Sequence, residues 1–238
     1  MIPLLLHTHS EYSFIWKATI GLLLKYASNY TIYWCSDELC GFELPSNFIY
    51  HQYDPKLNWS QRIKPLLEKI DSKYLIYVQE DYLLVDYMDK EKIEYLLEYM
   101  TENKIDFMMS YLTYEMIYGM PIKSKYEDYL FAKIKGHYNQ PAIWSKELFG
   151  KMVDLDITLP QIESTKVYNL TNQANCWAII NIKNKDVSIP TLYFPHMHAI
   201  NTKKWTFKRY PEMKALLESF GVDTNVIGVT EEWITDYK

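Results

Sequence analysis

The segment at residues 74–86 reads YLIYVQEDYLLVD and decides the predicted fold. It begins with an apolar run of aromatic and β-branched side chains at residues 74–78. Such runs are typical of strands that are buried on both faces of a parallel sheet. The run ends in Gln79, Glu80 and Asp81, and two adjacent carboxylates are tolerated at the carboxyl end of a strand, where open α/β sheets bind ligands, but not in its middle. The segment therefore predicts a central strand that delivers acids into a cleft, where they hold a divalent cation.

Strand and helix patterns alternate around this segment. Short apolar runs of strand type occur at residues 2–7, 30–35, 48–53 and 105–110. Helical patterns occur at residues 14–26, 59–70 and 90–102, and Asn58 is a candidate cap for the second of them. Alternation of this kind predicts an α/β fold with a mostly parallel central sheet, flanked by helices and joined by right-handed crossovers.

The pattern is less regular after residue 110. We expect a short extended run at residues 140–144, a helix at 165–178, a strand at 187–194 and a last helix at 211–220. No internal repeat and no low-complexity linker divides the chain. The sequence therefore predicts one domain with two halves, residues 1–110 and residues 111–238.

Composition excludes several classes of protein. The chain has 238 residues, 48% of them hydrophobic, and a formal net charge of −5, which argues against a nucleic-acid partner. It has 7 glycines and neither a P-loop nor a GxGxxG pattern. Its 3 cysteines lack metal-site spacing, which is typical of a reducing compartment. No signal peptide and no transmembrane segment is expected, so we predict a cytoplasmic protein.

Polar clusters follow four of the predicted strands. They are the segment from Thr8 to Tyr12, the pair Asp37-Glu38, the triplet from Gln79 to Asp81, and the segment from His196 to His198. Because the carboxyl ends of parallel strands lie along one edge of a sheet, we expect these four clusters to form one site.

Several short motifs resemble one family of enzymes. They are Trp59-Ser60-Gln61-Arg62, the run YLIYVQEDYLL at residues 74–84, the run QPAIW at residues 140–144, and Lys203-Lys204-Trp205. Their order and spacing resemble glycosyltransferases of the GT-A fold, which is Rossmann-type. Within that fold, they are most similar to a bacterial and large-virus group in which a Trp-Ser-x-Arg helix precedes a strand that ends in an acidic triplet. The resemblance covers residues 2–205.

The resemblance implies a role for each matching residue. Asp81 would bind Mn²⁺ or Mg²⁺, and His198 stands where these enzymes often carry a last metal ligand. Gln79 departs from the first Asp of the usual Asp-x-Asp motif, and Glu80 would contact the sugar or the water shell of the metal. The donor-binding residues implied in this way are Thr8, His9, Ser10, Tyr12, Asp37, Arg62, Gln79, Glu80, Asp81 and Lys204.

An inverting transfer also requires a general base near the acceptor hydroxyl. Glu163 is the candidate, because it lies at a turn before a helix and after the segment expected to face the acceptor. The alternative for Glu163 is a carboxylate that stabilises the start of that helix. The resemblance thus implies an inverting glycosyltransferase (EC 2.4) that moves a hexose or pentose from a nucleoside-diphosphate sugar, by resemblance UDP-linked, to a glycan acceptor. Residues 1–110 would bind the donor and residues 111–238 the acceptor.

Three other hypotheses remain open. His7 and His9 also resemble the first metal motif of PHP-type phosphoesterases, although no histidine directly follows the second strand and only His51, His137, His196 and His198 remain in the rest of the chain. A sugar-nucleotide-binding module without catalysis would use the same fold. A sugar nucleotidyltransferase is a further option, but its usual Gly-rich amino-terminal loop is absent here.

Overall fold

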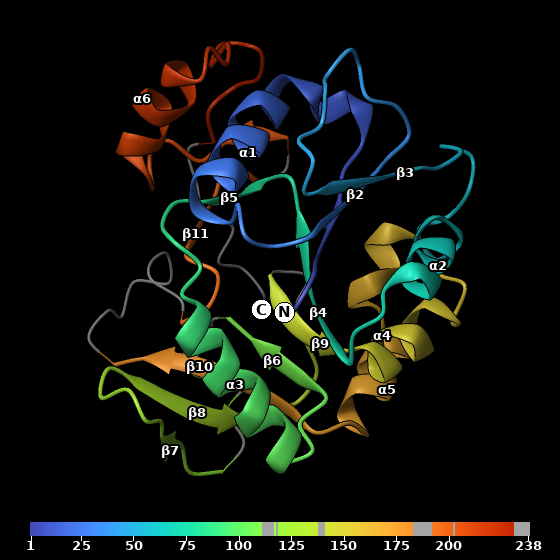
Figure 1. The fold of residues 1–238 in the computed structure, drawn as a ribbon, viewed down its shortest axis with the longest axis vertical. Coiled ribbons are helices and arrows are strands. Elements are labelled where there is room, and N and C mark those ends of the chain that lie inside the picture. The colour runs from blue at the N-terminus through green and yellow to red at the C-terminus, as the bar shows by residue number, and fades with distance from the viewer. Residues whose placement is uncertain (111–116, 118, 138–140, 183–191, 202, 231–238) are drawn as a thin grey trace.

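The computed structural model describes the whole chain except residues 111–116, 118, 138–140, 183–191, 202 and 231–238 (Figure 1). Its centre is a nine-stranded sheet. From one edge to the other the strands are β3 (Phe48–Gln52), β2 (Ile32–Ser36), β1 (Leu4–His7), β4 (Tyr74–Gln79), β9 (Ala142–Ser145), β6 (Phe107–Met109), β10 (Cys176–Asn181), β8 (Tyr129–Lys133) and β7 (Ile122–Lys123).

Most strands of this sheet point the same way. The four strands β3, β2, β1 and β4 are mutually parallel, and β10 is parallel to β6. Strand β9 lies antiparallel between β4 and β6, and β8 lies antiparallel between β10 and β7. This arrangement confirms the predicted α/β class with a mostly parallel central sheet.

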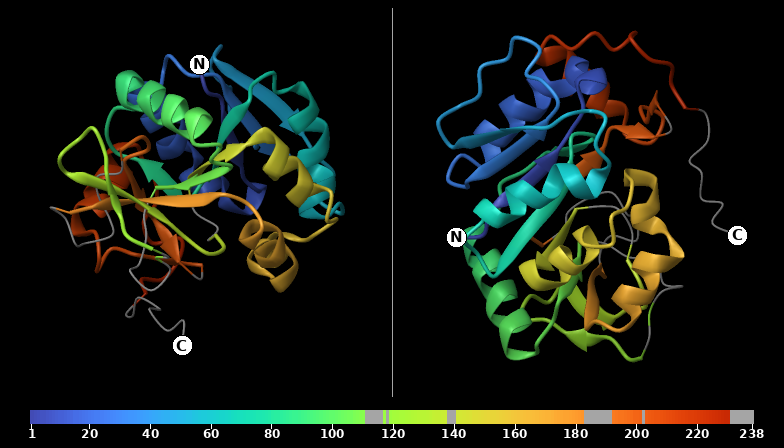
Figure 2. Two further views of the ribbon diagram at one scale, coloured as in Figure 1. Left: turned by 90° about the horizontal axis from the view of Figure 1, so that it is seen from below. Right: turned by 90° about the vertical axis from the view of Figure 1, so that its right-hand side faces the viewer.

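Helices cover both faces of the sheet (Figure 2). One face packs against α1 (Ser13–Tyr26), α3 (Lys90–Glu102) and α6 (Pro211–Ser219). The other packs against α2 (Trp59–Lys69), α4 (Lys146–Val153) and α5 (Thr165–Asn172). Leu4 and Leu6 of β1 belong to the first core and Leu5 to the second, because successive side chains of a strand point to opposite faces. Both faces of β1 are therefore apolar, as expected of a buried central strand.

One small sheet connects the carboxyl-terminal part of the chain to the segment after β4, and a second is a hairpin. Strand β5 (Tyr82–Leu84) pairs antiparallel with β11 (His196–His198), so that His198 lies opposite Tyr82. A hairpin of β12 (Ile200–Asn201) and β13 (Lys204–Trp205) follows. Two short 3₁₀ helices complete the described elements, η1 (Ser10–Tyr12) directly after β1 and η3 (Leu159–Glu163) before α5.

The predicted helix at residues 165–178 is wrong in its second half. Helix α5 ends at Asn172, and Cys176 begins strand β10, which lies between β6 and β8. Asn175 ends the helical segment by donating from its side chain to the carbonyls of Asn103 and Lys104. The strand that follows, CWAIIN, is rich in aromatic and β-branched residues and is buried among its neighbours.

The strand expected at residues 187–194 falls mostly outside the described residues. The other elements expected up to residue 110, and the last helix, are present with bounds close to the predicted ones. Within the described residues, none of the helices has both the length and the hydrophobicity needed to cross a lipid bilayer.

Candidate functional site

Three of the four polar clusters meet at the carboxyl edge of the sheet. His7, the last residue of β1, pairs in register with Cys35 of β2 and with Gln79 of β4. The residues that follow these positions, Thr8 to Tyr12, Asp37, and Glu80 with Asp81, therefore leave the sheet at the same level. Parallel strands thus bring the clusters together as the sequence predicts.

The fourth cluster reaches the site by a different route. His198 is not at the end of a strand of the main sheet, because it belongs to β11, which pairs with β5. This pairing places His198 Nε2 3.0 Å from Asp81 Oδ2. The imidazole stacks on the ring of Tyr82, with centroids 4.5 Å apart and planes 7° apart. Thr206 donates a 2.6 Å hydrogen bond to the carbonyl of His198, so the strand that carries this histidine is fixed.

His196 has a structural role in the same strand. It is buried, with Nδ1 2.7 Å from the carbonyl oxygen of Phe194. Burial lowers the pKa of His196 to about 4. Of the two histidines at strand spacing, only His198 meets the acid pair.

Glu80 is buried and Asp81 is partly buried, and the two form an acid pair at the end of β4. The Glu80 side chain is buried, and burial together with the charge of Asp81 raises its pKa well above the usual value of a carboxyl group. Asp81 Oδ1 is also buried and has no hydrogen-bond partner. Buried polar atoms are usually paired, and a hard divalent cation is a partner that carboxylate oxygens favour. The donor set therefore fits Mn²⁺ or Mg²⁺.

Within the described residues, no group of three or more His, Cys, Asp or Glu side chains is placed to hold a metal. Asp81 and His198 would thus supply the protein ligands, and the remaining positions would be left to water and diphosphate oxygens. Sites with one or two protein carboxylates and substrate phosphates are common for Mg²⁺.

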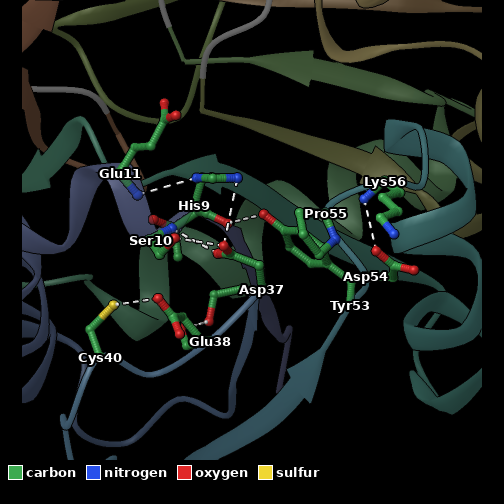
Figure 3. A network of polar contacts seen from close by, with 12 residues as sticks. His9, Ser10, Glu11, Asp37, Glu38, Cys40, Tyr53, Asp54, Pro55 and Lys56 are labelled. Carbon is green, nitrogen blue, oxygen red and sulfur yellow. Dashed lines mark hydrogen bonds and ion pairs between the residues drawn. The ribbon is translucent and has the colours of Figure 1, made fainter.

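Asp37 holds the turn after β1 from the neighbouring strand (Figure 3). Its Oδ1 accepts a 2.7 Å hydrogen bond from Ser10 N, and its Oδ2 accepts a 2.6 Å bond from Ser10 Oγ. His9 Nε2 lies 3.6 Å from the same Oδ2. Burial opposes ionisation of Asp37, but the bonds from Ser10 and the charge of His9 outweigh it, so the pKa of Asp37 is lowered.

Thr8 and Tyr53 anchor the same turn from inside the protein. Thr8 is buried, accepts a 2.7 Å bond from Trp16 Nε1 at its hydroxyl, and accepts a 2.7 Å bond from the Tyr53 hydroxyl at its carbonyl. Tyr12, at the other end of the turn, is half-buried, and burial together with the charges of Glu80 and Asp81 raises its pKa. The prediction from sequence missed Tyr53 and Trp16, although Tyr53 directly follows β3 as Asp37 directly follows β2.

Arg62 lies behind the turn. Its Nε and Nη2 donate 2.7 Å bonds to the carbonyls of Leu57 and Pro55, and its guanidinium lies 4.5 Å from the centre of the Tyr53 ring. It therefore braces the loop before α2. Burial, and then the charge of Arg62, lower the pKa of His7 to about 3, so Arg62 is electrostatically close to the end of β1.

The structure places the remaining predicted residues as follows. Gln79 ends β4 beside His7. Lys204 is exposed in the β12–β13 hairpin, opposite Asn201. Glu163 is the last residue of η3, and its side chain lies outside the described part, so its role as a base stays a prediction.

His7 and His9 have different surroundings. The His7 ring stacks on Tyr53, with centroids 5.6 Å apart, whereas the side chain of His9 is 30% exposed beside Asp37. In the part of the chain that the structure describes, neither histidine belongs to a group of three or more side chains that could hold a metal, as the phosphoesterase hypothesis requires.

A separate cleft of about 860 Å³ lies at the opposite, amino edge of the sheet, between α2 and α4. Lys73, Tyr74 and Asp106 are among its lining residues. None of the predicted donor-binding or metal-binding residues lines it, so it is distinct from the carboxyl-edge site.

No protein-family model matches the sequence, and no curated protein matches it. Solved structures with a similar arrangement include a cytidylyltransferase from Leptospira borgpetersenii serovar Hardjo-bovis, at 10% identity and a TM-score of 0.49, with 98% of each chain covered. Another is CMP:2-keto-3-deoxy-manno-octonic acid synthetase complexed with CTP, at 8% identity and a TM-score of 0.48, covering 92% of this chain and 98% of that one.

A third similar structure is the bifunctional IspDF from Campylobacter jejuni, at 15% identity and a TM-score of 0.44. The match covers 81% of this chain, but this chain spans only 52% of that protein. These TM-scores lie below 0.5, and the matches assign no activity and no residue role to this chain.

Proposed function

We propose that this chain is a metal-dependent glycosyltransferase that moves a sugar from a UDP-linked donor to a hydroxyl of a glycan acceptor, with inversion. The observation that supports this most strongly is the contact between Asp81 and His198 at the carboxyl edge, together with the unpartnered and buried Oδ1 of Asp81. Two ligands from distant segments and one free carboxylate oxygen suit a cation that also binds the phosphates of a donor.

The charges around the site favour the same reading. Asp37, Glu80 and Asp81 are all acidic, and Arg62 is the cation whose charge reaches His7 at the end of β1. A nucleoside diphosphate would be repelled by such a surface unless a cation lay between them. A bound divalent cation would neutralise the charge that builds on the leaving diphosphate.

The remaining roles would belong to residues of the protein itself. Asp81 and His198 would hold the cation, and the turn from His9 to Tyr12 would border the nucleoside. Glu163 would accept the proton of the acceptor hydroxyl, and Lys204 would contact the donor from its hairpin. Glu80 would contact the sugar or metal-bound water, and its raised pKa would fall when a cation binds nearby, because a positive charge favours the ionised carboxylate.

Sugar nucleotidyl transfer is the main rival, and the turn after β1 disfavours it. That chemistry needs a loop that cradles a triphosphate, usually through backbone amides. Here the amides of Thr8, Ser10, Glu11 and Tyr12 donate to groups of the protein itself. The turn therefore offers few amides to phosphate oxygens.

A thermal-shift panel tests the proposal. UDP-, GDP- and dTDP-sugars are each added with and without Mn²⁺, and CTP and UTP serve as nucleotidyltransferase probes. We expect a UDP-sugar with Mn²⁺ to raise the melting temperature, because a ligand that binds the folded state stabilises it. No shift with any nucleoside-diphosphate sugar, or a shift with nucleoside triphosphates alone, would contradict the proposed function. Binding without release of UDP, even when acceptor glycans are supplied, would indicate a non-catalytic module.

A further inference from the structure

We propose that Asp37 is a positioning residue: it fixes the His9–Tyr12 turn in a nucleotide-binding shape and does not itself contact the nucleotide. This inference rests on the proposed function and departs from the direct donor contact that the sequence suggests for Asp37. The observation that carries it is that both carboxylate oxygens of Asp37 are bound by one residue, Ser10, at 2.7 Å and 2.6 Å.

The loop that carries Asp37 is itself held on two sides. Gln52 donates a 2.8 Å bond to the carbonyl of Asp37. The hydroxyl of the buried Ser36 donates a 2.8 Å bond to the carbonyl of Glu38. The Asp37 side chain is only 10% exposed, so little of the carboxylate remains for a ligand. Turning it toward a nucleotide would break two short charge-assisted bonds, which are stronger than neutral ones.

The two hydrogen bonds from Ser10 to Asp37, here called the clamp, hold the turn at its middle. Ser10 N donates to Asp37, and Tyr12 N donates a 2.8 Å bond to the carbonyl of His9 that closes η1. Glu11 N donates to His9 Nδ1 at 3.2 Å, and His9 Nε2 faces Asp37. With its amides used internally, the turn can offer a nucleoside only side chains, above all His9 and Tyr12.

The turn and the acid pair leave the sheet at the same level, because His7 of β1 pairs in register with Gln79 of β4. The turn therefore adjoins the cation side of the site, and burial together with the charges of Glu80 and Asp81 raises the pKa of Tyr12. A turn released from Asp37 would lose this alignment, although Asp81 and His198 would keep theirs. Loss of the clamp should therefore weaken nucleotide binding and leave metal binding by those two residues in place.

A double-mutant cycle between Asp37 and Ser10 tests the inference. The probe is UDP with Mn²⁺, and the dissociation constant is measured by calorimetry for Asp37→Ala, Ser10→Ala and the double variant. We expect each single change to weaken binding by about 5- to 30-fold, as for the loss of one or two hydrogen bonds. The double variant should be no weaker than Asp37→Ala alone, because both changes break the same clamp.

Asp37→Asn separates positioning from direct charge recognition. An Asn side chain can still accept from Ser10 N and can donate to Ser10 Oγ, so we expect binding within about 3-fold of the parent protein. Glu38→Gln is the matched control, since Glu38 is the neighbouring acid and its side chain contacts Cys40, not Ser10. It should bind UDP as the parent does.

Amide hydrogen exchange of residues 10–12 in the free protein tests separately whether Asp37 orders the turn. Asp37→Ala should speed exchange there, and Asp37→Asn should not. Two results would overturn the positioning role and indicate direct contact. One is a double variant whose loss of UDP affinity is the product of the two single losses, and the other is an Asp37→Asn variant that binds UDP as weakly as Asp37→Ala. A parent protein that binds no nucleoside diphosphate would overturn the proposed function itself, and this inference with it.

Discussion

At the scale of single residues, burial sets the charge state of two histidines on the α2 side of the sheet. It lowers the pKa of His7 to about 3 and that of His137 to about 4. His137 lies edge-on to the rings of Phe107 and Trp144, with Nδ1 3.4 Å from Thr171 Oγ1. Both histidines are therefore neutral in the folded protein at any pH at which it is expected to be stable.

This charge state predicts a pH dependence of stability. An unfolded histidine has a pKa of about 6.5, so as the pH falls the unfolded chain takes up protons before the folded one does. The free energy of unfolding should decrease as the pH falls from about 6.5 toward 4, by roughly 1 kcal/mol for each histidine at about pH 5.5. Urea denaturation between about pH 7.5 and pH 4.5 measures this decrease.

His137→Asn provides the control, because the side-chain oxygen of Asn can replace Nδ1 near Thr171 but does not titrate. The variant should lose stability at neutral pH and show a shallower decrease on acidification than the parent. Parallel curves for the two proteins would show that His137 does not carry the effect.

At the scale of elements, a helix-interior glycine marks the contact between α1 and α6. A Cβ on Gly21 of α1 would collide with the ring of Phe220, the residue that ends α6. Gly150 of α4 is also inside a helix, but its nearest neighbour would be Leu67 Cδ2 at 3.7 Å, an ordinary contact. The two glycines are thus equivalent in backbone and differ in their neighbours.

Alanine at these two positions should have opposite effects. In a helix interior Ala is favoured over Gly by about 1 kcal/mol, so Gly150→Ala should raise the free energy of unfolding. Gly21→Ala should lower it by about 1 kcal/mol or more, since the ring of Phe220 must move. In a Phe220→Ala background the ring is absent, so Gly21→Ala should instead raise the free energy of unfolding. Equal stabilisation by Gly21→Ala and Gly150→Ala in the parent chain would show that α6 does not pack against α1 as described.

The elements also show how far the sequence determines the fold. The strand at residues 74–78 and its acidic end were predictable, because an apolar run that stops at two carboxylates has few places to lie other than the centre of a sheet. The end of α5 was not, since its helical pattern continues smoothly toward residue 178, and only tertiary pairing with β6 and β8 makes Cys176–Asn181 a strand. Tertiary context commonly overrides local pattern in this way.

The same limit applies to the site. Parallel strand order made the meeting of the Thr8, Asp37 and Asp81 clusters predictable. The contact of His198 with Asp81 depends on the pairing of β5 with β11, across 117 residues of sequence. Strand order and the family resemblance both pointed to His198, but neither predicted this pairing. The use of both Asp37 oxygens by Ser10 has no signal in the sequence, because a hydrogen-bond partner is chosen by geometry and not by residue type.

At the scale of the whole molecule, the carboxyl edge built by β1, β2 and β4 is met by a carboxyl-terminal segment that returns to it through β11. The contact between Asp81 and His198, each with a side chain 21% exposed, lies at that junction. If the chain is a glycosyltransferase, the bond that breaks in the donor is the one between the sugar and the diphosphate. The nucleoside diphosphate must then leave intact.

The identity of the released nucleotide tests the proposed glycosyl transfer. The measurement requires no knowledge of the acceptor, because water can slowly take the place of the acceptor. UDP-glucose, UDP-galactose and UDP-N-acetylglucosamine are each incubated with the protein and Mn²⁺, and the products are separated by ion-exchange chromatography. We expect Mn²⁺-dependent release of UDP from one of them, lost in Asp81→Asn and kept in Asp86→Asn, whose side chain is exposed in the same segment. Release of UMP with sugar 1-phosphate, or UDP release by Asp81→Asn at the parent rate, would contradict this expectation.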